Sequence, residues 1–114
     1  MVQVIPVNTN SDPVADEISA TKLISGEKAT QLWHTFSDAS DRFHVGHWGS
    51  EECEIDVSYS ESELCVIVEG RVSLTSKDGA VAEFKAGDAF VIPSGFEGTW
   101  KSIGTVKKIY ASFE

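Results

Sequence analysis

Glu63, Tyr59 and Lys108 have side chains suited to a polar binding site or an acid–base site. Glu63 begins the run ELCVIVEG, in which a carboxylate precedes a series of apolar residues. A carboxylate that points into an apolar interior needs an ion pair or hydrogen bonds, and burial favours its protonated form. Tyr59 is a candidate hydrogen-bond donor to Glu63, and Lys108 is a candidate cationic partner. Glu63 and Tyr59 are therefore candidate groups for ligand contact or general acid–base catalysis.

A structural role for Glu63 is also open. In this alternative its carboxylate accepts hydrogen bonds from backbone N–H groups and ties down the turn that follows residues 58–60.

The histidines and cysteines do not predict a metal site. His44 and His47 are three residues apart on a predicted strand, so they point to opposite faces, and His34 belongs to another strand. Cys53 and Cys65 are too few and too far apart for a zinc cluster, and the alternation places both in the core as small apolar side chains. We expect no cofactor.

Composition limits the classes of partner. The chain has 114 residues, which is the size of one domain, and a formal net charge of −9. Nucleic acids and anionic membranes both attract basic patches, so this charge argues against either partner. No basic start leads into a long apolar run, which predicts neither a signal peptide nor a membrane span. We therefore expect a cytoplasmic protein with free thiols.

Short runs separated by turns predict an all-β domain. Residues 1–29 are weakly patterned and are expected to form an irregular arm, with at most one helical turn within residues 11–20. From residue 30 onward the strands are closely spaced, as in a sandwich or small barrel. In the clearest of them Cys53, Ile55, Val57 and Tyr59 share one face. The predicted strands cover residues 29–36, 41–48, 52–59, 63–70, 71–76, 80–84, 89–93 and 105–113.

The spacing of several glycines, a proline and a glutamate resembles the cupins over about residues 40–113. Glu63 is followed after six residues by Gly70, and Gly87 is followed after five residues by Pro93-Ser94-Gly95. The resemblance implies an RmlC-like jelly-roll barrel, or double-stranded β-helix, for residues 30–114. The pattern is most similar to cupins grouped with ureidoglycine aminohydrolase, and a related cupin accompanies ethanolamine utilisation.

The resemblance also implies that the metal ligands of a cupin are missing. A metal cupin binds its ion with three histidines and one glutamate. In one alignment Asp56 and Ser58 replace the first two histidines. In the other Val57 and Tyr59 replace them, and the inward face of the strand favours this second alignment. Gly98 replaces the third histidine, so only the glutamate remains.

One further replacement follows from the same alignment. Ser102 stands in place of the cupin asparagine. Trp100 shares the face of Gly98, so we expect an aromatic side chain to pack over the glycine and an indole N–H that needs a partner. The candidate ligand contacts are Glu63, Tyr59, Trp100, Lys108 and Tyr110.

These observations leave three functional hypotheses open. The first is a metal-free cupin that binds a small polar metabolite and is accessory to small-metabolite catabolism. The second is a metal-independent enzyme that uses Glu63 and Tyr59 in proton transfer, and the third is a metal-dependent enzyme of the aminohydrolase kind. The apolar outer face of Leu64, Val66 and Val68 further predicts a homodimer.

Overall fold

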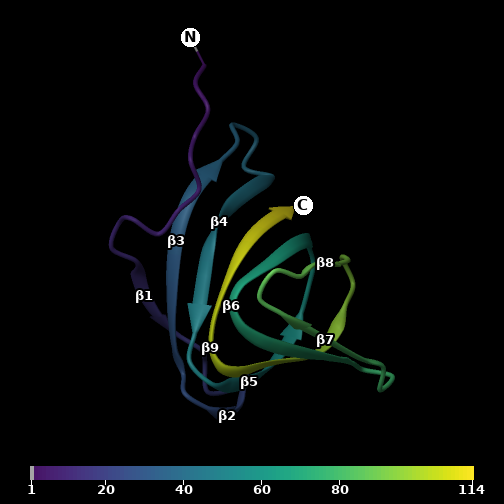
Figure 1. Ribbon diagram of the computed structural model, residues 1–114. Helices are drawn as coiled ribbons and strands as arrows, with labels where there is room; N and C mark the ends of the chain where they lie inside the picture. The colour runs from purple at the N-terminus through teal and green to yellow at the C-terminus, as the bar shows by residue number, and fades with distance from the viewer. Residues whose placement is uncertain (1) are drawn as a thin grey trace.

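The structure is a computed structural model that describes residues 2–114, which form nine β-strands and no helix (Figure 1). No segment of this part of the chain forms a helix able to cross a membrane. The all-β expectation is confirmed. The strands are β1 Val14–Glu17, β2 Leu23–Gly26, β3 Ala29–Ser37, β4 Phe43–Ser50, β5 Cys53–Ser58, β6 Ser62–Ser76, β7 Val81–Lys85, β8 Ala89–Ile92 and β9 Glu97–Phe113.

The strands form one curled antiparallel sheet. Six of them follow the order β1-β3-β4-β9-β5-β2, and β6 pairs with β7, β8 and β9. The long β9 lies at the centre, because residues 106–113 pair with β4 and residues 97–102 pair with β5. On its other edge β9 pairs with β6 along almost its whole length. The β6–β9 ribbon therefore links the two halves of the sheet and curls around the interior (Figure 1).

Two glycines allow this ribbon to bend. The pairing of β6 with β9 shifts register between Glu69 and Arg71, and the glycine between them, Gly70, has φ +86°. A Cβ atom at Gly70 would lie 2.2 Å from the carbonyl oxygen of Thr105. Gly104 has φ +73° at the corresponding bend of β9. Glycine is needed at Gly70 for its backbone conformation and for the close approach of the partner strand.

The alternation of β5 gives the predicted inward face. Cys53 and Ile55 are buried, whereas Asp56 and Ser58 are exposed. The predicted strands 63–70 and 71–76 are one continuous bent strand, β6. Around them the core is formed by Cys53, Ile55, Cys65, Ile67, Val72, Leu74, Ile92, Trp100 and Val106.

The expected irregular arm is shorter than residues 1–29. β1 pairs with β3 and β2 pairs with β5, so residues 14–17 and 23–26 belong to the sheet. The helical turn expected within residues 11–20 is wrong, because β1 occupies the middle of this segment and no residue of it is helical. The free edges of β3 and β5 offer unpaired backbone groups, and pairing with them outweighs the weak local preference of these residues.

Candidate functional site

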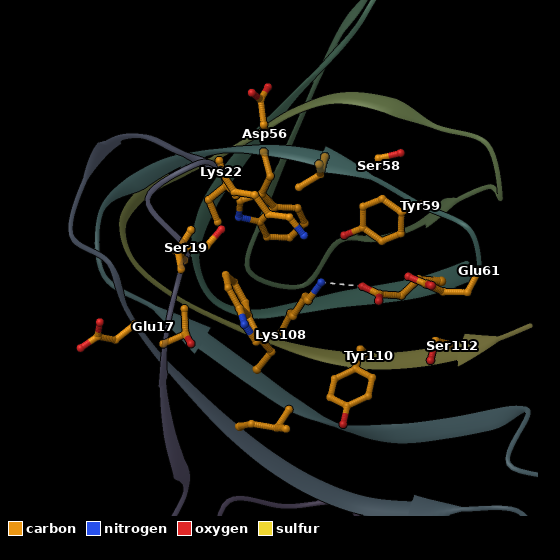
Figure 2. Close-up of a pocket in the computed structure, with 18 residues that line it drawn as sticks. Glu17, Ser19, Lys22, Asp56, Ser58, Tyr59, Glu61, Lys108, Tyr110 and Ser112 are labelled. Atoms are coloured by element: carbon orange, nitrogen blue, oxygen red, sulfur yellow. Dashed lines mark hydrogen bonds and ion pairs between the residues drawn. The ribbon is translucent and has the colours of Figure 1, made fainter.

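A pocket of about 620 Å³ lies inside the curled sheet (Figure 2). It is lined by side chains from β5, β6 and β9, by Trp48 of β4, and by residues of β1 and the turn before β2. The sheet brings all five candidate residues from the sequence into this one pocket. They are Glu63, Tyr59, Trp100, Lys108 and Tyr110.

An ion pair lies on the inner face of the β6–β9 ribbon. Lys108 is opposite Ile67 in the ladder, and its side chain runs along the inner face to Glu63. The distance from Lys108 Nζ to Glu63 Oε1 is 2.5 Å, and the side chains are 8% and 11% exposed. The predicted pairing of Glu63 with Lys108 is confirmed.

The Lys108 ammonium also lies against two indole rings. Its Nζ is 4.4 Å from the ring centre of Trp100 and 5.3 Å from that of Trp48. The two rings meet edge to face at 5.7 Å. The negative faces of the rings attract the cation, and this attraction strengthens away from water. The Trp100 indole N–H donates to Ser102 Oγ at 2.9 Å, which supplies the partner expected from the sequence.

Cys65 completes the contacts of the ion pair, although the sequence indicated only a core role for it. Its thiol donates to Glu63 Oε1 over 3.0 Å, and Lys108 Nζ lies 3.6 Å from Cys65 Sγ. Burial, with the Glu63 carboxylate as a further cause, raises the pKa of Cys65 to about 12. The thiol therefore stays protonated. The signal for this contact was the spacing of two residues, which places Cys65 and Glu63 on one face of β6.

The Lys108 side chain keeps its charge in this setting. Burial disfavours the ammonium, but the neighbouring acidic groups of Tyr59, Cys65 and Glu63 favour it, and the pKa of Lys108 is raised. At neutral pH the negative charge that stabilises the Lys108 ammonium is the Glu63 carboxylate, which contacts it directly.

Tyr59 lies beside the ion pair without bonding to it. Its hydroxyl points toward the end of the Lys108 side chain (Figure 2). Burial raises the pKa of Tyr59 to about 12. The expected hydrogen bond from Tyr59 to Glu63 is wrong: the side chains that donate to this carboxylate are Lys108 and Cys65. The structural alternative for Glu63 is also wrong, since these partners are side chains and not the backbone of the preceding turn.

The residues present do not fit a cupin metal centre. Val57 and Gly98 are opposite each other in the ladder and offer no donor side chain, and the Glu63 carboxylate is engaged by an ammonium. Within residues 2–114 no three side chains of His, Cys, Asp or Glu come together as metal ligands. A single carboxylate is too small a set for a first-row transition metal.

Gly98 is crowded by backbone. A Cβ atom there would lie 2.0 Å from the carbonyl oxygen of Thr75 on β6. The expectation that an aromatic ring packs over Gly98 is wrong, because the neighbouring strand itself fills the space.

The histidines are distributed over two faces of the sheet, as predicted. His47 is buried beside Trp33 on the face opposite to His44, and burial together with Lys107 lowers the pKa of His47. The structure brings His34 and His44 close together, with ring centres 6.0 Å apart. The sequence did not predict this approach.

Residues 37–110 match the family described as the EutQ-like cupin domain. The chain belongs to this cupin family. No curated protein matches the sequence of this cupin.

Solved structures show the same fold. A protein of unknown function from Pseudomonas syringae pv. tomato, of the DUF861 family, has a TM-score of 0.83 and 24% identity over 93% of this cupin. A DUF861-family protein from Thermotoga maritima is 36% identical, with a TM-score of 0.55, over 56% of this cupin and 73% of that chain. A putative ethanolamine utilization protein Q from Salmonella typhimurium has a TM-score of 0.67 and 16% identity, over 92% of this cupin and 98% of that chain.

This cupin spans 46% of the Pseudomonas chain. The likenesses to the Pseudomonas and Salmonella proteins, at 24% and 16% identity, show the cupin fold alone.

Proposed function

We propose that this domain is a metal-free cupin that binds a small polar metabolite in the pocket around Glu63. The observation that carries the proposal is the Lys108–Glu63 ion pair on the pocket wall, whose ammonium lies against two indole rings. A metal cupin uses this glutamate to hold an ion. Here a lysine ammonium supplies the positive charge from the protein itself.

The pocket has free polar atoms for a ligand. Lys108 and Cys65 both donate to Glu63 Oε1, and no hydrogen bond from the described residues reaches Oε2. The Tyr59 hydroxyl is likewise unpaired within residues 2–114 and is directed into the pocket (Figure 2). A few polar groups in a pocket that is also lined by the rings of Trp48 and Trp100 are typical of a site that binds and orients a small molecule.

Acid–base catalysis by Tyr59 receives less support. With its pKa raised to about 12, the Tyr59 hydroxyl holds its proton at neutral pH, and so does the Cys65 thiol. An efficient general acid or base has a pKa nearer to the working pH. We therefore assign Glu63, Tyr59, Trp100, Lys108 and Tyr110 to ligand contact.

We further propose a cytoplasmic role that is accessory to small-metabolite catabolism. Its support is the family of the chain, since the Salmonella neighbour is described as a putative ethanolamine utilization protein. The two buried free thiols agree with a reducing compartment.

A panel of small polar compounds tests the binding proposal. Amines, carboxylic acids, amides and polyols are added at about 10 mM, and indole fluorescence and melting temperature are recorded. We expect at least one class to raise the melting temperature and to change the emission of Trp48 and Trp100. Lys108→Met should weaken that response.

The matched control is Lys107→Met, because Lys107 is the neighbouring residue of β9 and contacts Trp33 outside the pocket. A panel without any binder, or a response that is equal in both lysine variants, would contradict the proposal.

A further inference from the structure

Polar side chains of β3, β4 and β9 form a second set of contacts beside the pocket. The Tyr110 hydroxyl lies 2.9 Å from His34 Nδ1, and His34 Nε2 lies 2.8 Å from Ser37 Oγ. Ser37 Oγ lies 2.7 Å from His44 Nδ1, and His44 Nε2 lies 3.1 Å from the carbonyl oxygen of Asp41. These five residues form a continuous hydrogen-bonded chain, which we call the relay. It runs from the pocket wall to the exposed turn before β4.

Two features of the sheet make the relay possible. Gly46 is opposite both His34 and Tyr110 in the ladder, and a Cβ atom at Gly46 would lie 2.7 Å from the Tyr110 hydroxyl. Glycine therefore lets the tyrosine reach across β4. A register shift between His34 and Phe36 marks a bulge in β3. In a regular strand residues three apart face opposite sides, and the bulge turns Ser37 toward His34.

The end of the relay fixes the direction of its hydrogen bonds. The Asp41 carbonyl oxygen can only accept, so a neutral His44 carries its proton on Nε2 and accepts at Nδ1. Ser37 must then donate to His44 and accept from His34 Nε2–H. His34 Nδ1 is left as an acceptor.

The direction of the relay determines what Tyr110 offers to the pocket. Since His34 Nδ1 accepts, the Tyr110 hydroxyl donates its only proton to the relay. The lone pairs of the Tyr110 oxygen are then the polar feature that this side chain can offer to a ligand. The hydroxyl points away from Lys108 (Figure 2). Thr30 and Leu32 of β3 also line the pocket.

We propose that the relay holds Tyr110 as a hydrogen-bond acceptor and thereby makes this wall of the pocket select ligands with an N–H or O–H donor. The inference rests on the proposed binding function. His34, Ser37 and His44 are positioning residues, because they act on the ligand through Tyr110.

The relay also gives a proton from the ligand a path to the protein surface. If the ligand transfers a proton to the Tyr110 oxygen, the hydroxyl proton passes to His34 Nδ1 and the His34 Nε2 proton passes to Ser37. The Ser37 proton passes to His44 Nδ1, and the His44 Nε2 proton leaves to water. One proton enters the relay and one leaves it, with no other reactant.

Nitrogen NMR of the ligand-free protein tests the direction of the relay. With ¹⁵N-labelled histidine at about pH 8, where imidazoles are neutral as a rule, we expect His34 and His44 to be Nε2–H tautomers. Ser37→Ala should release His34 into mixed tautomers, while His44 stays an Nε2–H tautomer because the Asp41 carbonyl oxygen still accepts from it. Ser37→Thr keeps a hydroxyl and should restore the single tautomer. An Nδ1–H tautomer at either histidine of the unmodified protein would overturn the relay.

A matched pair of amides tests the ligand class. Acetamide has N–H donors and N,N-dimethylacetamide has none. We expect acetamide to bind about five-fold more tightly, which is the effect of one ordinary hydrogen bond, as followed by shifts of the Trp48 and Trp100 indole signals. The preference should disappear in Tyr110→Phe and in Ser37→Ala, and it should persist in Ser37→Thr.

Two results would separate this inference from the proposed function. Equal binding of the two amides, or binding of other panel compounds without acetamide, would overturn the donor selection while leaving a small-molecule pocket. Failure of every compound to bind would contradict the proposed function and the donor selection together.

Discussion

At the scale of single residues, Lys108 and Glu63 each depend on the other for a place in the interior. Removing an ion from water costs several kcal/mol, and attraction within a buried pair offsets this cost only when both partners are present. In this cupin the pair is 8% and 11% exposed and is completed by a thiol and two indole rings. The buried pair therefore indicates that the protein needs a positive charge at this position. It is not evidence that the pair adds stability.

Removal of one partner should be costly and removal of both should be mild. We expect Lys108→Met to lower the free energy of unfolding by about 3–5 kcal/mol, because Glu63 is left buried without its cation. The double variant Lys108→Met/Glu63→Gln should recover most of this loss. Urea unfolding of the single and double variants measures the coupling. Strictly additive losses would show that the two side chains do not act as a pair.

The raised pKa values of Tyr59 and Cys65 predict a loss of stability at alkaline pH. Their ordinary values are 10.0 and 9.0, and both are raised to about 12 in the folded protein. The folded state therefore holds these protons more tightly than the unfolded state. The associated stability is complete below about pH 9 and is lost as the pH rises toward 12.

Denaturant midpoints measured from pH 7 to 11 check this dependence. Tyr59→Phe removes one of the two groups and should flatten the decline. A midpoint that stays level from pH 9 to 11, or a decline that Tyr59→Phe leaves unchanged, would argue against protonated groups at these positions.

At the scale of strands, the close approach of β9 to β6 explains why a glycine occupies position 98. The Thr75 carbonyl oxygen is 2.0 Å from the place of a Cβ atom, and backbone cannot move aside as a flexible side chain can. We expect Gly98→Ala to cost about 1–3 kcal/mol, or several degrees of melting temperature. Gly49→Ala is the control, since its nearest contact would be 3.3 Å, and it should cost less. Equal melting temperatures for the two variants would contradict this account of Gly98.

Local pattern predicted the strands well where alternation or turn residues were clear. The inward face of β5 and the end of β8 before Pro93 follow from side-chain period and from the missing N–H of proline. β1 and β2 were not predicted, because their residues carry no pattern and they form by pairing with the edges of strands that do not follow them directly in the sequence. The continuity of β6 and β9 was missed because glycines that usually end strands here only bend them.

The candidate site, like the strands, could be predicted from the sequence only in part. Glu63 and Lys108 were detectable as charged residues within apolar runs, and their pairing followed from the need for compensation. The relay was not detectable, because the approach of His34 to His44 depends on a bulge and on Gly46. A bulge inverts the face of every residue after it, and period alone does not reveal where it occurs.

At the scale of the whole molecule, apolar side chains remain uncovered on the outside of the sheet. Leu64 is 43% exposed, Val68 is 42% exposed and Val91 is 60% exposed, and Leu64 is opposite Val91 in the ladder. Contiguous exposed apolar side chains on a sheet are typical of an interaction surface. We propose that two copies of the chain associate through this face.

Light scattering tests the assembly. At about 0.1 mM we expect the mass of a dimer, since this concentration is well above the dissociation constant of a typical weak dimer. Leu64→Glu should give the mass of a monomer, because a carboxylate would be buried without a partner. A monomer mass for the unmodified chain at this concentration would contradict the proposed homodimer.

Elemental analysis is the most direct test of the claim that Lys108 supplies the positive charge that a metal ion supplies in other cupins. The protein is incubated with manganese, iron, nickel or zinc, desalted and analysed for bound metal. We predict less than about a tenth of an equivalent of any of them, because Glu63 is paired with Lys108 and no histidines accompany it. About one equivalent of tightly bound metal that is lost in Glu63→Gln would contradict the claim.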